Sequence, residues 1–316
     1  MVMRVSPDGV FGGIFVQNEI LIYRFMEPNG NLLPEKISSR AVETHRVNHP
    51  TFHKMQDLYI FKNDHADYQM YVLFEEGILL YNSIDRRTEP HKVYDFAAEQ
   101  LYLTPGLSDC RKDVLMVEAV RRLPNNQEEH SVYKFQQLNI LSKHELEGAK
   151  QMLYFFKEYT IEVKHITKGV VGPNGAGQTI SQLSIYDFKN KITMYWNPPA
   201  NGTICDVQIE ETPGQEGIYY IAESYEGTRV DRELMKLYPM EDNVKIYNLM
   251  KKSHYTEALN IARDANFPEE IQSEIIKEHA DKLFQQKKYD EAIEQYMQTI
   301  GFLNPSFVIQ NYIQVT

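Results

Sequence analysis

The chain has 316 residues, a length that suggests about two domains. Acidic residues outnumber basic ones by 44 to 33, giving a formal net charge of -11, which argues against nucleic acid as a partner because its phosphates require clustered Lys and Arg. No apolar run approaches the roughly 18–20 residues of a membrane-spanning helix, and the N-terminus lacks a signal-peptide pattern. The only cysteines, Cys110 and Cys205, give no disulfide framework, which favours a reducing, cytoplasmic setting.

Residues 1–236 are predicted to form β-strands. Short apolar runs rich in Val, Ile, Tyr and Phe recur, separated by Asn, Gly, Asp and Pro, which is the pattern of short strands joined by turns. An apolar residue, a tyrosine and a polar residue recur together at tyrosines spaced by 58, 52 and 53 residues, namely Tyr23, Tyr81, Tyr133 and Tyr186. A fainter fifth copy lies at residues 228–231.

This repeat predicts a β-propeller. A period of about 40–50 residues with several strands per repeat is typical of propeller blades. We therefore predict a partial propeller of about five WD-like blades over residues 1–236, each with three to four strands. A large antiparallel sandwich is the alternative, but it offers no reason for a constant period. The sequence leaves open whether five blades close into a ring or belong to a larger propeller.

Residues 241–316 are predicted to form helices, because they are rich in Ala, Glu, Lys, Gln and Leu. The segment 251–259 recurs at 286–293, and Tyr255 and Tyr289 are 34 residues apart, which is the length of a tetratricopeptide repeat. We predict the start of an α-solenoid of helix-turn-helix repeats. The fold class is thus mixed, with a β region followed by an α region.

Apolar spacing and helix-boundary residues define the predicted helices. Pro268 is expected in the first turn of a helix, Gly301 is expected to end a later helix in a left-handed conformation, and Asn304 is expected to cap the next. Two apolar stripes are expected to face each other across a helix pair. The first comprises Ile271, Ile275, Ala280, Leu283 and Phe284, and the second Ala292, Ile293, Tyr296, Met297 and Ile300.

Residues 172–179, with the sequence GPNGAGQT, have the glycine spacing of a phosphate-binding P-loop. Gln178 stands where a P-loop has its lysine, and residues 179–186 alternate between polar and apolar as a strand does, whereas a P-loop opens a helix. A turn between two strands is therefore the preferred interpretation, and a nucleotide-binding enzyme is the remote alternative.

Other candidate chemistry is weak. His45, His49 and His53 would share one helix face, but Pro50 interrupts that helix and no acidic or cysteine ligand follows, so a solvated loop is preferred over a metal site. The adjacent acid pairs do not predict acid-base dyads, because neighbouring side chains diverge. Carboxylates near both cysteines would raise the pKa of each thiol and disfavour a nucleophile. We predict no enzyme, and no catalytic, cofactor-binding or metal-binding residue; no residue is singled out for partner binding.

The helical region resembles one family. The string from Gln295 to Ile309, QYMQTIGFLNPSFVI, together with the segments 279–284 and 288–293, resembles the vacuolar protein sorting-associated protein 11 family. Residues 183–188 and 251–262 also look like the matching family segments. The resemblance is clear over about residues 245–313 and thin over residues 1–236.

The resemblance implies a scaffold or adaptor subunit shared by two membrane-tethering complexes, HOPS and CORVET, which act in vesicle docking and fusion at endosomes, lysosomes and vacuoles. It implies other vacuolar sorting subunits as partners, Rab-type GTPases reached indirectly through the complex, and peripheral, indirect membrane contact. Family members carry a propeller, a long solenoid and a RING zinc domain, so this chain is expected to be a fragment without the RING. The alternative scaffolds are clathrin-like coat subunits and intraflagellar transport proteins.

Overall fold

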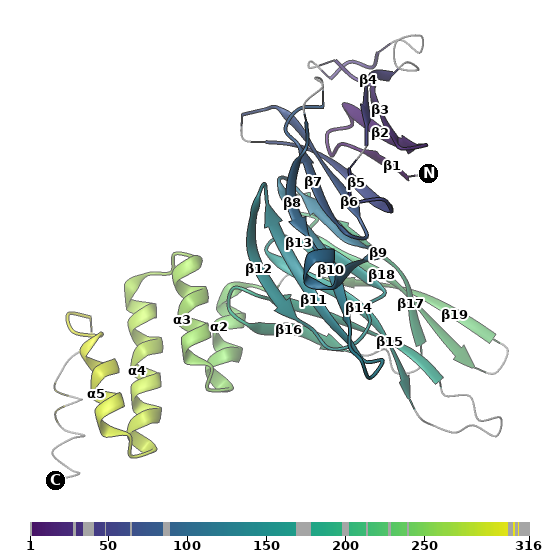
Figure 1. The fold of residues 1–316 in the computed structure, drawn as a ribbon. Helices are drawn as coiled ribbons and strands as arrows, with labels where there is room; N and C mark the ends of the chain where they lie inside the picture. The colour runs from purple at the N-terminus through teal and green to yellow at the C-terminus, as the bar shows by residue number, and fades with distance from the viewer. Residues whose placement is uncertain are drawn as a thin grey trace. The chain divides into compact units, whose positions relative to one another are not determined.

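The structure is a computed structural model, and it describes most of the chain (Figure 1). The described residues are 2–27, 30–33, 41–47, 49–63, 65–84, 89–168, 178–197, 202–212, 214–226, 229–238, 240–302, 306 and 309. The chain divides into two compact units. The first comprises residues 1–211 and 218–236, and the second comprises residues 212–217 and 237–316. Asn304, Pro305 and residues 169–177, which include the glycines of the P-loop-like segment, lie outside the described residues.

In the described part of the first unit, the strands form five antiparallel sheets that follow one another along the chain (Figure 1). Four sheets have four strands in sequence order and one has three. The first sheet contains β1 (Val2–Val5), β2 (Phe11–Val16), β3 (Glu19–Arg24) and β4 (Ala41–Arg46). The second contains β5 (Met55–Lys62), β6 (Tyr68–Phe74), β7 (Gly77–Tyr81) and β8 (His91–Asp95).

The remaining sheets continue the same meander. A single 3-10 turn, η1 (Ala97–Glu99), precedes the third sheet. That sheet contains β9 (Leu101–Arg111), β10 (Val114–Arg122), β11 (Glu128–Gln136) and β12 (Asn139–Glu145). The fourth contains β13 (Met152–Phe156), β14 (Tyr159–Lys168), β15 (Gln178–Asp187) and β16 (Ile192–Asn197), and the fifth contains β17 (Gly202–Glu210), β18 (Gly217–Glu226) and β19 (Arg229–Leu237).

The sequence repeat corresponds to these sheets. Tyr23, Tyr81, Tyr133 and Tyr186 lie in β3, β7, β11 and β15, which are the third strands of the first four sheets. The described residues 229–231 of the faint fifth copy begin β19, the third strand of the fifth sheet. The period therefore corresponds to one sheet per repeat, as the sequence predicts.

Consecutive sheets pack through apolar cores. Ile20 and Ile22 of the first sheet meet Leu58 and Val72 of the second. The other face of the second sheet packs on the third, and Tyr71 there belongs to the same buried cluster as the third-sheet aromatics Tyr133 and Phe135. A third cluster joins the third and fourth sheets, and its buried members are Leu107, Met116, Val132, Leu153 and Phe155. Burial of these large side chains stabilises the stacking by roughly 1.5–3 kcal/mol each.

Polar contacts also join the first strands of consecutive sheets. Arg4 Nε of β1 donates to Asp57 Oδ1 of β5 at 2.9 Å, and the hydroxyl of Tyr59 donates to the carbonyl of Ser108 in β9 at 2.7 Å. Further along the chain, the Phe155 N–H of β13 donates to Asp109 Oδ2 of β9 at 2.7 Å. The first strands of the first four sheets therefore lie beside one another in chain order.

A repeated aspartate marks these first strands. Asp57, Asp109 and Asp206 each accept the backbone N–H of the following residue at 2.9 Å, in β5, β9 and β17 respectively. The second oxygen of Asp57 pairs with Arg4, and that of Asp109 receives the N–H of Phe155. This repeat is structural and was not predicted from the sequence, because the residues around each aspartate differ.

The second unit contains paired helices. Helices α2 (Asp242–Lys251), α3 (Tyr255–Asp264), α4 (Glu269–Gln285) and α5 (Tyr289–Met297) follow in order (Figure 1). Small residues at the helix contacts, namely Ala258, Ala262, Ala280 and Ala292, are all fully buried. Gly301 has a φ of +97°, so its predicted left-handed conformation is confirmed. Pro268 is the N-cap of α4, one position earlier than predicted.

The two predicted apolar stripes are only partly correct. Ile275, Ala280, Leu283, Ala292 and Tyr296 are buried, as predicted. In contrast, Ile271, Ile293, Met297 and Ile300 are exposed, with Ile300 at 70%. The contact between α4 and α5 is narrower than the predicted stripes. Its buried members are Ala280, Leu283, Ala292 and Tyr296, with Phe284 partly buried against them, and Ile300 lies beyond the end of α5.

Candidate functional site

A bulge in the third sheet opens a polar pocket. In the pairing of β9 with β10, Leu103 opposes Ala119 and Ser108 opposes Val117, so residues 104–107 of β9 stand opposite the single residue Glu118. Pro105 and Gly106, whose φ is +74°, allow this excursion because proline cannot donate to the ladder and glycine tolerates positive φ. Bulges of this kind often re-aim a side chain next to a functional site.

The pocket encloses about 680 Å³ beside Glu118. Its lining includes Thr104 and Pro105 of the bulge, Glu118 and Val120 of β10, and His130 of β11. Tyr102, Glu128 and Lys150 also line it. Glu118 is only 1% exposed, so its side chain is buried beneath the surface of the sheet.

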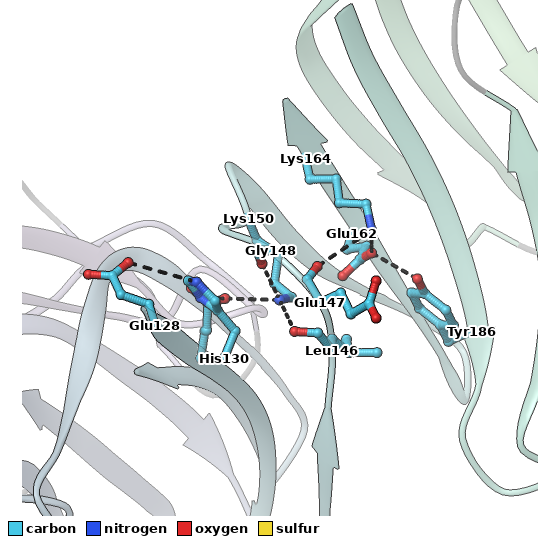
Figure 2. A network of polar contacts seen from close by, with 10 residues as sticks. Glu128, His130, Leu146, Glu147, Gly148, Lys150, Glu162, Lys164 and Tyr186 are labelled. Atoms are coloured by element: carbon cyan, nitrogen blue, oxygen red, sulfur yellow. Dashed lines mark hydrogen bonds and ion pairs between the residues drawn. The ribbon is translucent and has the colours of Figure 1, made fainter. Parts of the chain in front are cut away.

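Glu118 is held by two basic side chains. Oε1 of Glu118 lies 3.2 Å from Lys150 Nζ and 3.1 Å from His130 Nδ1. The side chain of Lys150 has no exposed surface, and its ammonium group also donates to the carbonyls of Leu146 and Gly148 at 3.2 and 2.9 Å. Figure 2 shows these contacts converging on Lys150. The three donors of Lys150 are therefore satisfied by three oxygens.

A second part of the same network reaches the fourth sheet (Figure 2). Lys164 of β14 donates to the carbonyl of Glu147 at 3.5 Å and lies 3.6 Å from Glu162 Oε1. The hydroxyl of Tyr186 donates to the same oxygen of Glu162 at 2.8 Å. The segment between β12 and β13 is thus tied on one side to β10 and on the other to β14.

Two buried oxygens in the pocket lining have no partner among the described residues. They are Oε2 of Glu118 and Oγ1 of Thr104. A buried acceptor without a donor costs roughly 1–3 kcal/mol, and more when the acceptor is charged. Both oxygens are buried from solvent, so they lie beneath the lining of the pocket rather than on its open surface.

Glu118 is engaged through Oε1 by Lys150 and His130, and no serine, threonine or cysteine beside His130 forms the nucleophile–base pair that covalent catalysis requires among the described residues. Within the described ranges, no group of three His, Cys, Asp or Glu side chains is arranged to hold a metal ion.

The three histidines considered as ligands are not among the residues that line this pocket, and within the described ranges they form no group arranged to hold a metal ion. His45 belongs to β4 rather than to a solvated loop, is 4% exposed, and its Nε2 lies 3.0 Å from the carbonyl of Ile84. His49 stacks on Phe52 with ring centroids 4.2 Å apart, and His53 is exposed. The loop interpretation is therefore wrong for His45, whose ring packs edge-on against Tyr81 in the core.

The acid pairs diverge as predicted. Glu75 pairs with Lys54, whereas its neighbour Glu76 receives the backbone N–H of His53. Glu128 lies 3.5 Å from Arg122 across the strand pair, and Glu129 lies 3.6 Å from Arg121. Two of these acids, Glu75 and Glu128, nevertheless line the pocket.

The prediction for the two thiols is confirmed in direction, with a different leading cause. Burial, followed by the carboxylates of Asp109 and Asp113, raises the pKa of Cys110 well above its usual value. Burial and then Glu223 raise the pKa of Cys205. Neither thiol is therefore poised as a thiolate near neutral pH.

The P-loop-like segment does not open a helix. Gln178 and Thr179 begin β15, which pairs with β14 from Lys168↔Gln178 onward. The residues that should form the first turn of a phosphate-binding helix are therefore in a strand, as the preferred interpretation required.

Sequence reasoning missed Glu118, Thr104, His130 and Lys150. Two signals were available: Pro105-Gly106 inside an apolar strand pattern, which indicates a bulge, and a lone glutamate within the apolar run of residues 115–120. Lys150 carried no signal, because its role depends on the path of the chain between two sheets.

The fold defines a protein of strand-rich repeats followed by paired helices. Comparison of its sequence with known proteins relates the chain to one family. No family model matches the chain. A vacuolar protein-sorting-associated protein 11 homolog of Arabidopsis thaliana is 25% identical over 167 residues, covering 53% of this chain and 16% of the relative. The corresponding homologs of Homo sapiens and Dictyostelium discoideum are 27% and 31% identical, covering 53% and 52% of this chain and 17% and 19% of the relatives.

These matches confirm the resemblance to the vacuolar protein sorting-associated protein 11 family. The chain is related to that family over about half of its own length, and the match spans less than a fifth of each of these relatives. Residues 241–316 number only 76, so more than half of the 167 matched residues lie before them. The resemblance thus extends well into the strand region, where the sequence alone showed only a thin likeness.

Solved structures with a similar trace are remote. An endo-arabinase from Bacteroides thetaiotaomicron has a TM-score of 0.37 at 10% identity, covering 76% of this chain and 94% of that structure. Sqt1 from Saccharomyces cerevisiae has a TM-score of 0.35 at 9% identity, covering 75% of this chain and 72% of that structure. In the described part of the chain, no helix is long and apolar enough to cross a membrane.

Proposed function

We propose that the chain acts as a scaffold or adaptor in a membrane-tethering complex of the endosomal and vacuolar or lysosomal system. The observation that carries the proposal is the match to homologs of vacuolar protein sorting-associated protein 11 from a plant, an animal and a slime mould. The proposed complexes are HOPS and CORVET, acting in vesicle docking, fusion and intracellular protein transport.

The proposed architecture is a partial β-propeller over residues 1–236 and the start of an α-solenoid over residues 241–316. One sheet per repeat, stacking of consecutive sheets and neighbouring first strands support the propeller. The helix pairs with buried alanines support the solenoid. Both shapes present large surfaces without chemistry of their own, which suits a protein that works by holding partners.

The proposed partners are other vacuolar sorting subunits, with Rab-type GTPases recruited indirectly. Membrane contact is proposed to be peripheral and to pass through those partners. Enzyme activity and a cofactor form no part of the proposal.

Affinity purification of the tagged full chain from cells tests this function. Other vacuolar sorting subunits are expected in the eluate, identified by mass spectrometry, and should be absent from an eluate of the tag alone. Recovery of clathrin light chain or ciliary transport subunits without sorting subunits would instead assign the chain to another propeller–solenoid scaffold.

A further inference from the structure

We propose that the free edge of β19 binds an extended segment of a partner protein. The segment adds to the fifth sheet as a fourth strand and carries a basic side chain among apolar ones. This goes beyond the proposed scaffold function, because it names a surface and a chemistry for one contact. It relies on that function only in taking the occupant to be another protein.

The other sheets indicate what belongs beside β19. In each of the first four sheets, the third strand lies between a second and a fourth strand and is hydrogen-bonded to both. β19 is the third strand of the fifth sheet, yet in the described part of the chain only β18 pairs with it (Figure 1). After β19 the chain enters α2 at Asp242 rather than another strand. The hydrogen-bonding groups on the outer edge of β19 are therefore available to an added strand.

The outer edges of the first four sheets are built differently. Each pairing of a third with a fourth strand skips one residue of the fourth strand, so each of these fourth strands carries a β-bulge. The skipped residues are all apolar, namely Val42, Val93, Leu141 and Met194. A bulge distorts the edge of a sheet and hinders the addition of another strand. The edge of the fifth sheet is a third strand instead, so a bulged fourth strand does not protect it.

Three apolar side chains of β19 are exposed beside this edge. Val230, Leu234 and Met235 are 48%, 71% and 40% exposed. Because side chains alternate between the two faces of a strand, Val230 and Leu234 lie on one face and Met235 on the other. An added strand would cover apolar surface on both faces, which favours its binding. Since all three side chains are open to solvent, no part of the structure has to move before the strand can add.

The charges on β19 favour a basic occupant. Arg229 pairs with Asp231 at 2.8 Å, and Arg232 pairs with a glutamate of β18 at 2.6 Å. Lys236 lies over a tyrosine ring of β18. Glu233 is exposed and forms no ion pair with any described residue, so a lysine or arginine opposite it on an added strand would form a cross-strand ion pair. The net charge of -11 also favours a basic partner over an acidic one.

A second copy of the chain fits this edge poorly. Two antiparallel copies of β19 related by a two-fold axis would overlap most in three registers. These registers place Arg232 opposite Arg232, Glu233 opposite Glu233, or Arg232 opposite Lys236. Like charges directly opposite each other destabilise a strand pair. The edge therefore favours a strand from a different protein.

Amide-detected NMR of the deuterated full chain, titrated with synthetic strands, tests the proposal. The probe is the acetylated and amidated peptide Thr-Thr-Val-Val-Lys-Thr-Thr-Val-Thr. When it lies antiparallel to β19, its lysine is opposite Glu233 and its valines are opposite Val230, Leu234 and Met235. Shift changes are expected in residues 229–237, with a dissociation constant on the order of 0.1–1 mM.

Two control peptides separate charge from strand formation. The peptide with glutamate in place of lysine should bind about fivefold more weakly, because a like-charge pair replaces an opposite-charge pair. The peptide with proline in place of the second valine should give no shifts in β19, because proline cannot donate a hydrogen bond to the neighbouring strand.

Glu233→Lys provides a charge swap. Because Glu233 is exposed and has no ion-pair partner among the described residues, this variant should fold as the parent does. It should prefer the glutamate peptide over the lysine peptide by about fivefold. Glu145→Lys is the matched control, because Glu145 is an exposed residue of the bulged edge strand β12. This second variant should keep the preference of the parent for the lysine peptide.

An unchanged peptide preference in Glu233→Lys, or shift changes centred on the fourth strands rather than on β19, would overturn the proposal. Slow hydrogen exchange of every amide of β19 without peptide would also overturn it, because another segment would then already fill the edge. These measurements use the purified chain alone, so their failure leaves the affinity-purification result intact. Loss of the sorting subunits from that eluate would likewise leave the peptide selectivity intact.

Discussion

Lys150 and Glu118 form the most deeply buried ion pair of the network in Figure 2, with side-chain exposures of 0% and 1%. Removing one member of such a pair leaves an uncompensated buried charge, which typically costs about 3–5 kcal/mol. Lys150→Met is therefore expected to lower the free energy of unfolding by about that amount in urea titrations.

The double variant Glu118→Leu with Lys150→Met is the control for this pair. Because it removes both charges, it should be less destabilised than the sum of the two single variants, so the coupling energy of the cycle is large. Additive effects, or a cost below about 1 kcal/mol for Lys150→Met, would show that the pair does not hold the segment between β12 and β13.

The partial burial of Lys134 leads us to expect that the free energy of unfolding depends on pH. Its ammonium lies 5.1 Å from the ring centroids of both Phe155 and Phe188, and burial lowers its pKa to about 8. Between about pH 8 and the ordinary lysine value of 10.5 the unfolded chain binds this proton and the folded chain does not, so folding stability contributed by this group rises with pH.

Lys134→Met should therefore raise the free energy of unfolding at pH 7 and flatten its rise between pH 8 and 10.5, relative to the parent. Urea titrations at pH 7, 8, 9 and 10 measure this difference. Lys143→Met, at an exposed lysine of β12, should leave the slope of the parent unchanged. A parent-like slope in Lys134→Met would mean that Lys134 stays charged in the folded chain.

At the scale of the elements, the contact between α4 and α5 depends on two alanines. Ala280 and Ala292 are fully buried against Leu283 and Tyr296. Ala292→Glu would bury an unpaired charge and overfill this contact, and it is expected to cost more than about 3 kcal/mol. A circular-dichroism melt should show early loss of helix.

Ile293→Glu is the matched control, since it introduces the same side chain one position along α5. Ile293 is 41% exposed, so the free energy of unfolding of this variant should lie within about 0.5 kcal/mol of that of the parent. Equal destabilisation of the two variants would show that α5 is rotated relative to the contact described above.

The strand and helix repeats could be predicted from the sequence, whereas the pocket and the width of the helix contact could not. The tyrosine period was visible because the third strands of the first four sheets each carry an apolar–tyrosine–polar triplet. The 34-residue helix repeat was visible because Ala258 and Ala292, 34 residues apart, are both buried. The pocket was not visible, because Glu118 meets Lys150 only through the connection between two sheets. The stripes were too wide, because helical spacing alone does not set how far a partner helix covers a face.

At the scale of the whole molecule, the net charge of -11 bears on membranes. An acidic protein is repelled by anionic lipid. The sequence also contains no run of five or more Lys and Arg residues that would bind anionic lipid headgroups. The purified chain should therefore stay unbound in flotation with phosphatidylserine liposomes, and it should float only when partner sorting subunits are added.

Phosphatidylcholine liposomes are the control for this assay and should give the same result without partners. Direct binding of the lone chain to phosphatidylserine liposomes that weakens with added salt would contradict indirect membrane contact.

Self-association is a separate expectation from the exposed apolar residues at the end of the helical unit, which include Met297, Ile300, Phe302 and Ile309.

The contacts between first strands bear on how the chain is made. Arg4 meets Asp57, Tyr59 meets Ser108 and Asp109 meets Phe155, so each sheet finds its partner surface on the sheet synthesised just before it. Closing a loop of about 50 residues costs little more entropy than closing a shorter one, and chains generally fold from the N-terminus as they emerge from the ribosome. The strand unit can therefore assemble one sheet at a time during translation, and a ribosome stalled after the third sheet should already carry a nascent chain whose first two sheets resist protease.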